Sequence, residues 1–298
     1  MEERSEYIQV KTSAGPANLY VHIWPSPEKR GRVICFHEQA CTGAEFAFLA
    51  ESLNSAGFEV ICPDWIGHGQ STYFSDKGAY RWHDFVTCAL HTVRHYSDQE
   101  THLLGASFGG MILFVLMVAA RLAPKTATFV DIPLHKGVGP LELPLVKQLV
   151  GHSFSRMEDA KKHFAEYRHP LHRDSAHLEE YLTANRFHVE NGKVRVRCDP
   201  LVVARLEAQS GNAFDYRNDV PSLNCNSLFL YGRESANRDR EFFEKLSTQS
   251  RHILYDDSIE GRHPPPLTSF SQIKPIVDFL ISQPSSHAFA EESLHPRA

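Results

Sequence analysis

The feature that most constrains the fold is an alternation of short apolar runs with helical segments. The run 31–38 (GRVICFHE) is continuously apolar until its polar end, which is typical of a strand buried on both faces in a parallel sheet. Strands that alternate with helices predict a doubly wound sheet with helices on both faces. The other predicted strands here are 58–64, 102–105 and 126–131, and the helices between them are 43–56, 81–96 and 108–123.

The pattern changes after residue 131 and returns after residue 224. Charged, helix-like segments fill 132–224, and strands alternate with helices again from 227 to 282. We therefore expect an α/β fold with a doubly wound, mostly parallel sheet. Its core is predicted over 1–131 plus 225–282, a helical cap over 132–224, and a disordered tail over 283–298.

Charge and composition exclude several classes of protein. The 298 residues are 42% hydrophobic and 22% charged, with a formal net charge of −5, so nothing favours nucleic acid or an anionic membrane as partner. The first residues lack a signal-peptide core, and the apolar run 111–120 is too short to span a bilayer. These observations predict a cytoplasmic protein that acts on a small molecule, with a homodimer left open.

Cysteine and histidine spacing give no sign of a metal site. The six cysteines contain no C-x-x-C pair, which favours core thiols in a reducing compartment over disulfides. The 18 histidines contain no H-E-x-x-H spacing. We expect neither a metal nor another cofactor.

Ser107 lies among small residues at a predicted strand-to-helix turn. Residues 105–109 (GASFG) match the G-x-S-x-G pattern, in which a strained turn raises the serine hydroxyl out of the sheet edge. The N–H groups at the start of the following helix would face a developing oxyanion. Ser107 is thus a candidate nucleophile, although a small residue at a tight corner would give the same local pattern.

Several ordered motifs resemble the α/β-hydrolase superfamily. The segment VICFHEQACTGAEF is similar to the strand end that supplies part of the oxyanion hole, and VICPDWIGHGQS is similar to the D-x-x-G-x-G-x-S turn. The segments GASFGGM, LFLYGRES and EGRHPPP resemble the nucleophile elbow, the acid loop and the histidine loop. The resemblance implies the α/β-hydrolase fold and serine hydrolase chemistry.

The same resemblance implies the base and the oxyanion donors. His263 lies in the loop after the last predicted strand, where this family has its catalytic histidine. One oxyanion donor is expected to be the backbone N–H of Phe108, which follows the nucleophile. By position, the backbone N–H of Gln39 is expected to be the second.

The acid is where the sequence departs from the family. The usual loop has Ser235 and Ala236 where many relatives carry an aspartate. Asp131 ends the strand from which some α/β-hydrolases take their acid, and it is the first choice. Glu234 lies in the usual loop, slightly early, and Asp239 is better explained as part of a helix start. A chain without a functional acid is the remaining alternative.

A second departure lies at the predicted oxyanion hole. Glu38 follows His37 where relatives usually have glycine, and a carboxylate there would oppose oxyanion formation unless it points away or is paired. It could instead hold a cationic substrate group. Glu38, His37 and His68 are therefore candidates for residues that line the pocket.

The preferred function is a serine hydrolase that cleaves an ester, thioester or related carbonyl bond through an acyl-enzyme. The catalytic candidates are Ser107, His263 and Asp131. Hydrolysis of a C–C bond in vinylogous diketones is an alternative, because similar elbows and caps occur there. A degenerate hydrolase that binds a ligand without turnover is a second alternative, motivated by the missing acid and by Glu38.

Overall fold

The sheet has eight strands in the order β1-β2-β4-β3-β5-β6-β11-β12. The computed structural model describes residues 3–28, 30–76, 78–138, 144–167 and 176–283. The neighbours from β4 to β12 pair in parallel, whereas β1–β2 and β2–β4 are antiparallel. The predicted doubly wound, mostly parallel sheet is therefore confirmed. The tail predicted to be disordered lies, apart from its first residue, outside the described residues.

The central strands are largely buried, as expected for parallel strands with helices on both faces of the sheet. Every residue of β5 and of β6 is buried, whereas β1 alternates between exposed and buried positions over its second half. The strands are β1 Arg4–Thr12, β2 Gly15–Trp24, β3 Gly31–Phe36, β4 Phe58–Pro63, β5 Thr101–Ala106, β6 Thr126–Val130, β11 Asn226–Gly232 and β12 Ile253–Ile259.

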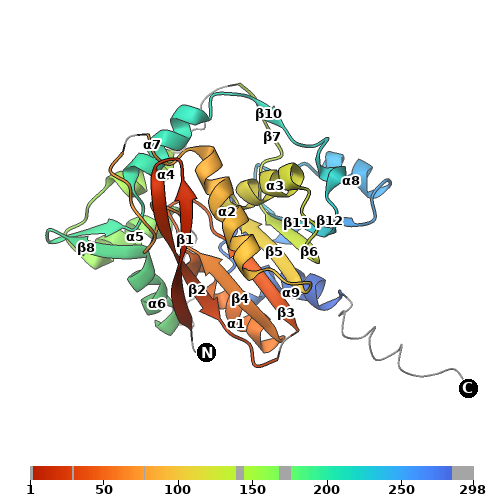
Figure 1. The fold of residues 1–298 in the computed structure, drawn as a ribbon, viewed down its shortest axis with the longest axis horizontal. Coiled ribbons are helices and arrows are strands. Elements are labelled where there is room, and N and C mark those ends of the chain that lie inside the picture. Colours follow the sequence, from red (N-terminus) through yellow and green to blue (C-terminus); the bar gives the residue numbers. More distant parts are fainter. Residues whose placement is uncertain (1–2, 29, 77, 139–143, 168–175, 284–298) are drawn as a thin grey trace, which may run out of the picture.

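Helices cover both faces of the sheet (Figure 1). Apolar residues of α2, α3 and α8 share one core cluster, and those of α1 and α9 share the cluster on the other face. This division is expected for right-handed crossovers between parallel strands. The helices are α1 Ala47–Ser55, α2 Trp82–Tyr96, α3 Phe108–Ala120, α8 Arg240–Ser247 and α9 Phe270–Ile281.

Two helices, α1 and α9, are irregular near their starts. Thr42 makes no side-chain cap hydrogen bond, and Gly43–Phe46 form a 3-10 turn before α1 begins. The helix α9 begins at Phe270 and contains Pro275 in its second turn. Five helical residues precede the proline, so most of the N–H donors of α9 lie beyond it.

Residues 132–224, called the inserted segment below, enter after β6 and return before β11. Their described part holds four helices but also two short antiparallel sheets, so it is not purely helical as predicted. Figure 1 shows α4 to α7 and β8 on one side of the molecule. The elements are β7 His135–Lys136, α4 Pro144–Gly151, α5 Met157–Tyr167, α6 Ala176–Arg186, β8 Phe187–Glu190, β9 Lys193–Val196, α7 Pro200–Gln209, β10 Phe214–Asp215 and a 3-10 turn at Val220–Ser222.

Most residues of a third apolar cluster belong to the inserted segment, and a buried ion pair connects the segment to the core. Arg186 donates to both carboxylate oxygens of Glu45, over 2.5 and 2.6 Å. The two side chains are only 11% and 4% exposed. The Arg186 guanidinium also lies 4.5 Å from the ring centre of Phe164 in α5. This pair therefore links the first turn before α1 to the end of α6.

A buried aspartate organises the turn after β4. Asp64 accepts hydrogen bonds from two backbone N–H groups, and a Cβ at Gly69 would lie 1.9 Å from its Oδ2. The ring of His22 lies between the carboxylates of Asp64 (3.3 Å) and Glu3 (2.6 Å). Burial alone would lower the pKa of His22, but these carboxylates outweigh it and raise the pKa to about 9.

The six cysteines are all free thiols, and five of them are buried. Within the described ranges, none of the helices is both long and apolar enough to cross a membrane.

Candidate active site

Ser107 lies at a sharp turn between β5 and α3. Its backbone has φ 46° and ψ −115°, a conformation that non-glycine residues rarely adopt. The turn brings β5 and α3 so close that a Cβ at Gly105 would lie 2.6 Å from the Cα of Gly110. A Cβ at Gly109 would lie 2.2 Å from the backbone oxygen of Phe36. The small residues of the motif are therefore required by close backbone contacts, and the strained turn presents the serine.

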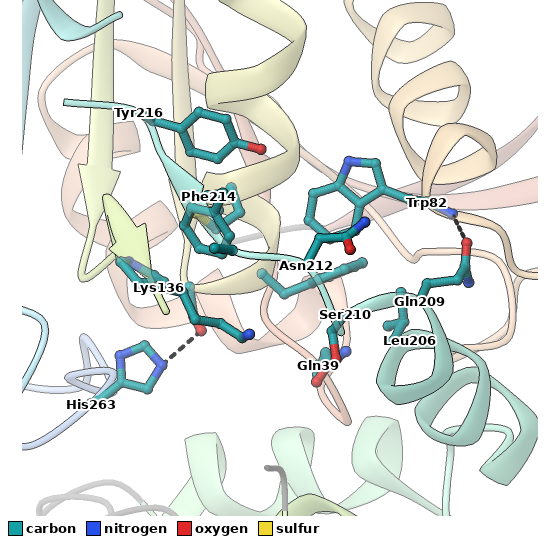
Figure 2. Close-up of a pocket in the computed structure, with 15 residues that line it drawn as sticks. Gln39, Trp82, Lys136, Leu206, Gln209, Ser210, Asn212, Phe214, Tyr216 and His263 are labelled. Atoms are coloured by element: carbon teal, nitrogen blue, oxygen red, sulfur yellow. Dashed lines mark hydrogen bonds between the residues drawn. The ribbon is translucent and has the colours of Figure 1, made fainter. Parts of the chain in front are cut away.

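His263 follows β12 and reaches Ser107. The distance from His263 Nε2 to Ser107 Oγ is 3.0 Å. Figure 2 shows His263 on the opposite side of the cavity from Trp82 and Gln209. Gly261, with φ +129°, lets the chain turn back toward the sheet edge before the histidine. The imidazole is 39% exposed, so it lies at the border between protein and cavity.

Asp131 contacts the other imidazole nitrogen. It follows β6 directly, is fully buried, and has φ +54°. Its Oδ1 lies 2.8 Å from His263 Nδ1. A carboxylate at Nδ1 favours the tautomer that is protonated there, which leaves Nε2 to accept a proton from Ser107. Of the acids considered, Asp131 is the one that the structure brings to the histidine.

The segment that usually carries the catalytic acid donates hydrogen bonds to Asp131. Ser235 Oγ donates to Asp131 Oδ1 over 2.6 Å, and the Gly232 N–H donates to Oδ2 over 3.2 Å. Asn237 Nδ2 lies 3.1 Å from Asp131 Oδ1 and 2.8 Å from His263 Nδ1. Sequence reasoning missed Ser235 and Asn237. Their small polar side chains, in a loop that lacks its usual carboxylate, were the available signal.

The other two acids have different partners. Glu234 is 61% exposed and lies 3.4 Å from the Arg262 guanidinium. Asp239 accepts a hydrogen bond from the N–H of Phe242 and so caps the start of α8. Asp239 is therefore a helix cap, as its position predicted.

A cavity of about 350 Å³ lies beside Ser107 and His263, a size that suits a small molecule. Gln39 and Phe108, the predicted oxyanion donors, both line it. Phe108 begins α3, so its backbone N–H has no partner within the helix. The cavity lies between core and inserted segment, and its remaining lining residues are Trp82, Met111, Pro133, Lys136, Leu206, Gln209, Ser210, Asn212, Ala213, Phe214 and Tyr216.

His37, Glu38 and His68 lie outside that lining, so the structure does not bring them to the cavity. His37 is buried, its Nε2 accepts from the backbone N–H of Trp65, and burial lowers its pKa to about 3. Burial lowers the pKa of His68 to about 4. Glu38 is 3% exposed and faces a separate small cavity beside Pro265. The two histidines are therefore neutral residues of the core.

Comparison with known proteins supports the same fold. Residues 32–125 match the family model described as alpha/beta hydrolase fold. A 3-hydroxybutyrate-oligomer hydrolase of Cupriavidus necator is 27% identical over 109 residues, which is 37% of this chain and 37% of that protein's length.

Solved structures match over nearly the whole chain. An alpha/beta hydrolase from Novosphingobium aromaticivorans has a TM-score of 0.74 and 18% identity, covering 94% of this chain and 99% of that chain. The thioesterase domain from the curacin biosynthetic pathway has a TM-score of 0.69 and 20% identity, with coverages of 94% and 100%. The chain thus has the α/β-hydrolase fold, and the resemblance to that superfamily is confirmed.

Proposed function

We propose that this chain is a serine hydrolase that cleaves a carboxylic ester, thioester or related carbonyl bond through an acyl-enzyme. The observation that carries the proposal is the position of the His263 imidazole. One nitrogen lies 3.0 Å from Ser107 Oγ and the other lies 2.8 Å from a buried carboxylate. A hydroxyl, a base and an orienting acid in this geometry are the components of an activated serine nucleophile.

In the first half of the reaction, Ser107 Oγ attacks the substrate carbonyl carbon and its proton passes to His263 Nε2. Asp131 stabilises the imidazolium that forms. The backbone N–H groups of Phe108 and Gln39 are the proposed donors to the oxyanion. When the tetrahedral intermediate collapses, the leaving group takes the proton from His263, and the acyl group stays on Ser107.

In the second half, water attacks the acyl carbon while His263 Nε2 accepts its proton. The proton then returns to Ser107 Oγ as the ester bond to the enzyme breaks, releasing the acid. The strained turn at Ser107 keeps Oγ at the cavity wall through both halves.

Two observations favour turnover over binding alone. The missing acid motivated the binding-only alternative, but Asp131 lies within hydrogen-bond distance of His263. Glu38 was the second motive, and it is buried outside the cavity lining.

Labelling with a fluorophosphonate probe tests the proposal. We expect one covalent adduct on Ser107, its loss in Ser107→Ala, and much slower labelling in His263→Ala. Ser247→Ala is the matched control, because that exposed hydroxyl only donates to a backbone oxygen in α8 and should leave labelling unchanged. A folded wild-type protein that stays unlabelled would refute the serine-nucleophile mechanism.

A further inference from the structure

The two ends of the cavity beside Ser107 suit different parts of a substrate. Figure 2 shows His263 on one side of the cavity and Trp82 and Gln209 on the opposite side. In the reaction proposed above, His263 Nε2 gives a proton to the leaving group, so that group must lie beside the imidazole. Ser107 and the oxyanion donors hold two further substituents of the tetrahedral carbon. The end at Trp82 therefore remains for the acyl chain.

The end of the cavity at Trp82 has an apolar wall. Phe108 and Leu206 line the cavity and also belong to a core cluster, with exposed fractions of only 8% and 4%. Trp82 packs against the same cluster. An aliphatic or aromatic chain placed against this wall loses contact with water, and that loss favours its binding.

Gln209 fastens the inserted segment to the first residue of α2. Its amide oxygen accepts the backbone N–H of Trp82 over 3.1 Å. Its amide nitrogen donates to the backbone oxygens of Tyr80 over 3.3 Å and Arg205 over 3.0 Å. Because an amide nitrogen has two donors, both are used within the protein. Gln209 therefore fixes the end of α7 beside Trp82.

The Trp82 indole closes this end of the cavity. It packs edge-to-face on the ring of Phe108, the residue after the nucleophile, with ring centroids 5.7 Å apart and planes at 86°. Edge contacts with Phe85 (5.0 Å) and Trp65 (6.0 Å) hold the Phe108 ring in turn. Such close packing resists an added methylene, so a chain that reaches the indole must displace it. Because Trp82 is only half-buried, its truncation lengthens the cavity and does not leave a sealed void.

We propose that this end of the cavity binds an uncharged, apolar acyl chain, and that Trp82 sets the maximum length of that chain. The substrate class is then an ester or thioester of an aliphatic acid of limited length. The proposal rests on the proposed serine hydrolase function. It gives Trp82 a role in specificity, which is distinct from the chemical step at Ser107 and His263.

The test measures kcat/KM for p-nitrophenyl acetate, butyrate, hexanoate, octanoate and decanoate, after subtraction of spontaneous hydrolysis. In wild type, kcat/KM should rise with each methylene and then fall once the chain reaches the indole. We expect Trp82→Ala to move the maximum to longer chains and to raise the decanoate-to-butyrate ratio of kcat/KM roughly 10- to 100-fold. That range corresponds to two or three further methylenes removed from water, each giving about a four-fold gain. Trp82→Phe should raise the ratio less.

A second series of esters locates the effect on the acyl side. Ethyl, butyl, hexyl and octyl butyrate differ only in the leaving group, which lies beside His263, so Trp82→Ala should leave their relative kcat/KM values unchanged. Tyr7→Ala is the matched control in the acyl series, because it removes an exposed ring of β1 outside the cavity lining. Fluorophosphonate labelling of Ser107 gives the fraction of active protein in each variant. Trp82→Phe keeps a ring against Phe108 and provides the test should Trp82→Ala not fold.

Three outcomes overturn the proposal. The first is an unchanged acyl-chain profile in the Trp82 variants. The second is a shift in the alkyl butyrate series and not in the acyl series, because the indole would then contact the leaving group. The third is an equal loss for all esters, because Trp82 would then act on folding or on the chemical step. Wild-type protein that cleaves none of the esters and stays unlabelled refutes the proposed function instead.

Discussion

Replacing Asp131 by asparagine tests the assignment of the acid. The Asp131 carboxylate lies 2.8 Å from His263 Nδ1, and two opposite charges about 4 Å apart attract by about 4 kcal/mol at an effective dielectric constant of about 20. Losing that attraction to the imidazolium should lower kcat about 1,000-fold. Ser235 and Asn237 both donate toward Oδ1, so they should keep the amide oxygen of Asp131→Asn toward His263 and preserve its tautomer.

The assay is hydrolysis of p-nitrophenyl butyrate, with kcat and KM measured separately. Asp131→Asn should lower kcat much more than it changes KM, because the imidazolium exists only during the reaction. Glu234→Gln is the matched control and should stay within about two-fold of wild type, because this carboxylate is exposed and lies beside Arg262. An Asp131→Asn variant with more than about a tenth of wild-type kcat would contradict the assignment, as would an equal loss in Glu234→Gln.

Moving the carboxylate from position 131 to position 237 provides a second test of how His263 is oriented. Asn237 Nδ2 lies 2.8 Å from His263 Nδ1, so Asn237→Asp can place an oxygen near that nitrogen. In the Asp131→Asn background this second change should recover roughly 10- to 100-fold in kcat. A double variant no more active than Asp131→Asn would show that position 237 cannot orient the imidazole.

Three further perturbations follow from other contacts. His22 has a pKa raised to about 9 in the folded state, so its stabilising effect is complete below about pH 6.5 and is lost as the pH rises through 9. The free energy of unfolding of wild type, relative to His22→Gln, should therefore fall by roughly 3 kcal/mol over that range in urea titrations. Arg186→Leu leaves Glu45 buried without this partner and should cost about 3–5 kcal/mol in the same measurement, with Glu45→Leu/Arg186→Leu clearly more stable than the single variant. Gly109→Ala forces a Cβ to 2.2 Å from a backbone oxygen of β3, so soluble, active protein with an unchanged melting temperature would contradict the described elbow.

Local patterns were sufficient for the core of the fold. The runs that became β3, β5 and β6 are buried over most or all of their length, and each contains enough apolar residues to be recognised without its partners. The inserted segment was harder, because its short strands are defined by pairing and not by periodicity. Lys136 of β7 pairs with Phe214 of β10, and no local pattern joins residues so distant in sequence.

In the candidate site, too, some residues were predictable from local sequence and one choice was not. Ser107 and His263 lie in motifs with characteristic neighbours, so the sequence predicted that they would meet. The choice between Asp131 and Glu234 depended on which carboxylate reaches His263 Nδ1, and residue spacing does not encode that distance. Because β6 and β11 are neighbours in the sheet, the loops that follow them lie side by side, and only the folded structure shows which carboxylate reaches the histidine.

The place where the inserted segment leaves the sheet has a consequence for protein engineering. It departs immediately after Asp131 and returns before Asn226. Because β6 and β11 pair in parallel, with Thr126 opposite Asn226 and Val130 opposite Leu230, its two joints lie at opposite ends of the paired strands. A foreign lid grafted here would have to span the length of these strands to meet both joints, but the serine, histidine and aspartate would all stay in the recipient scaffold.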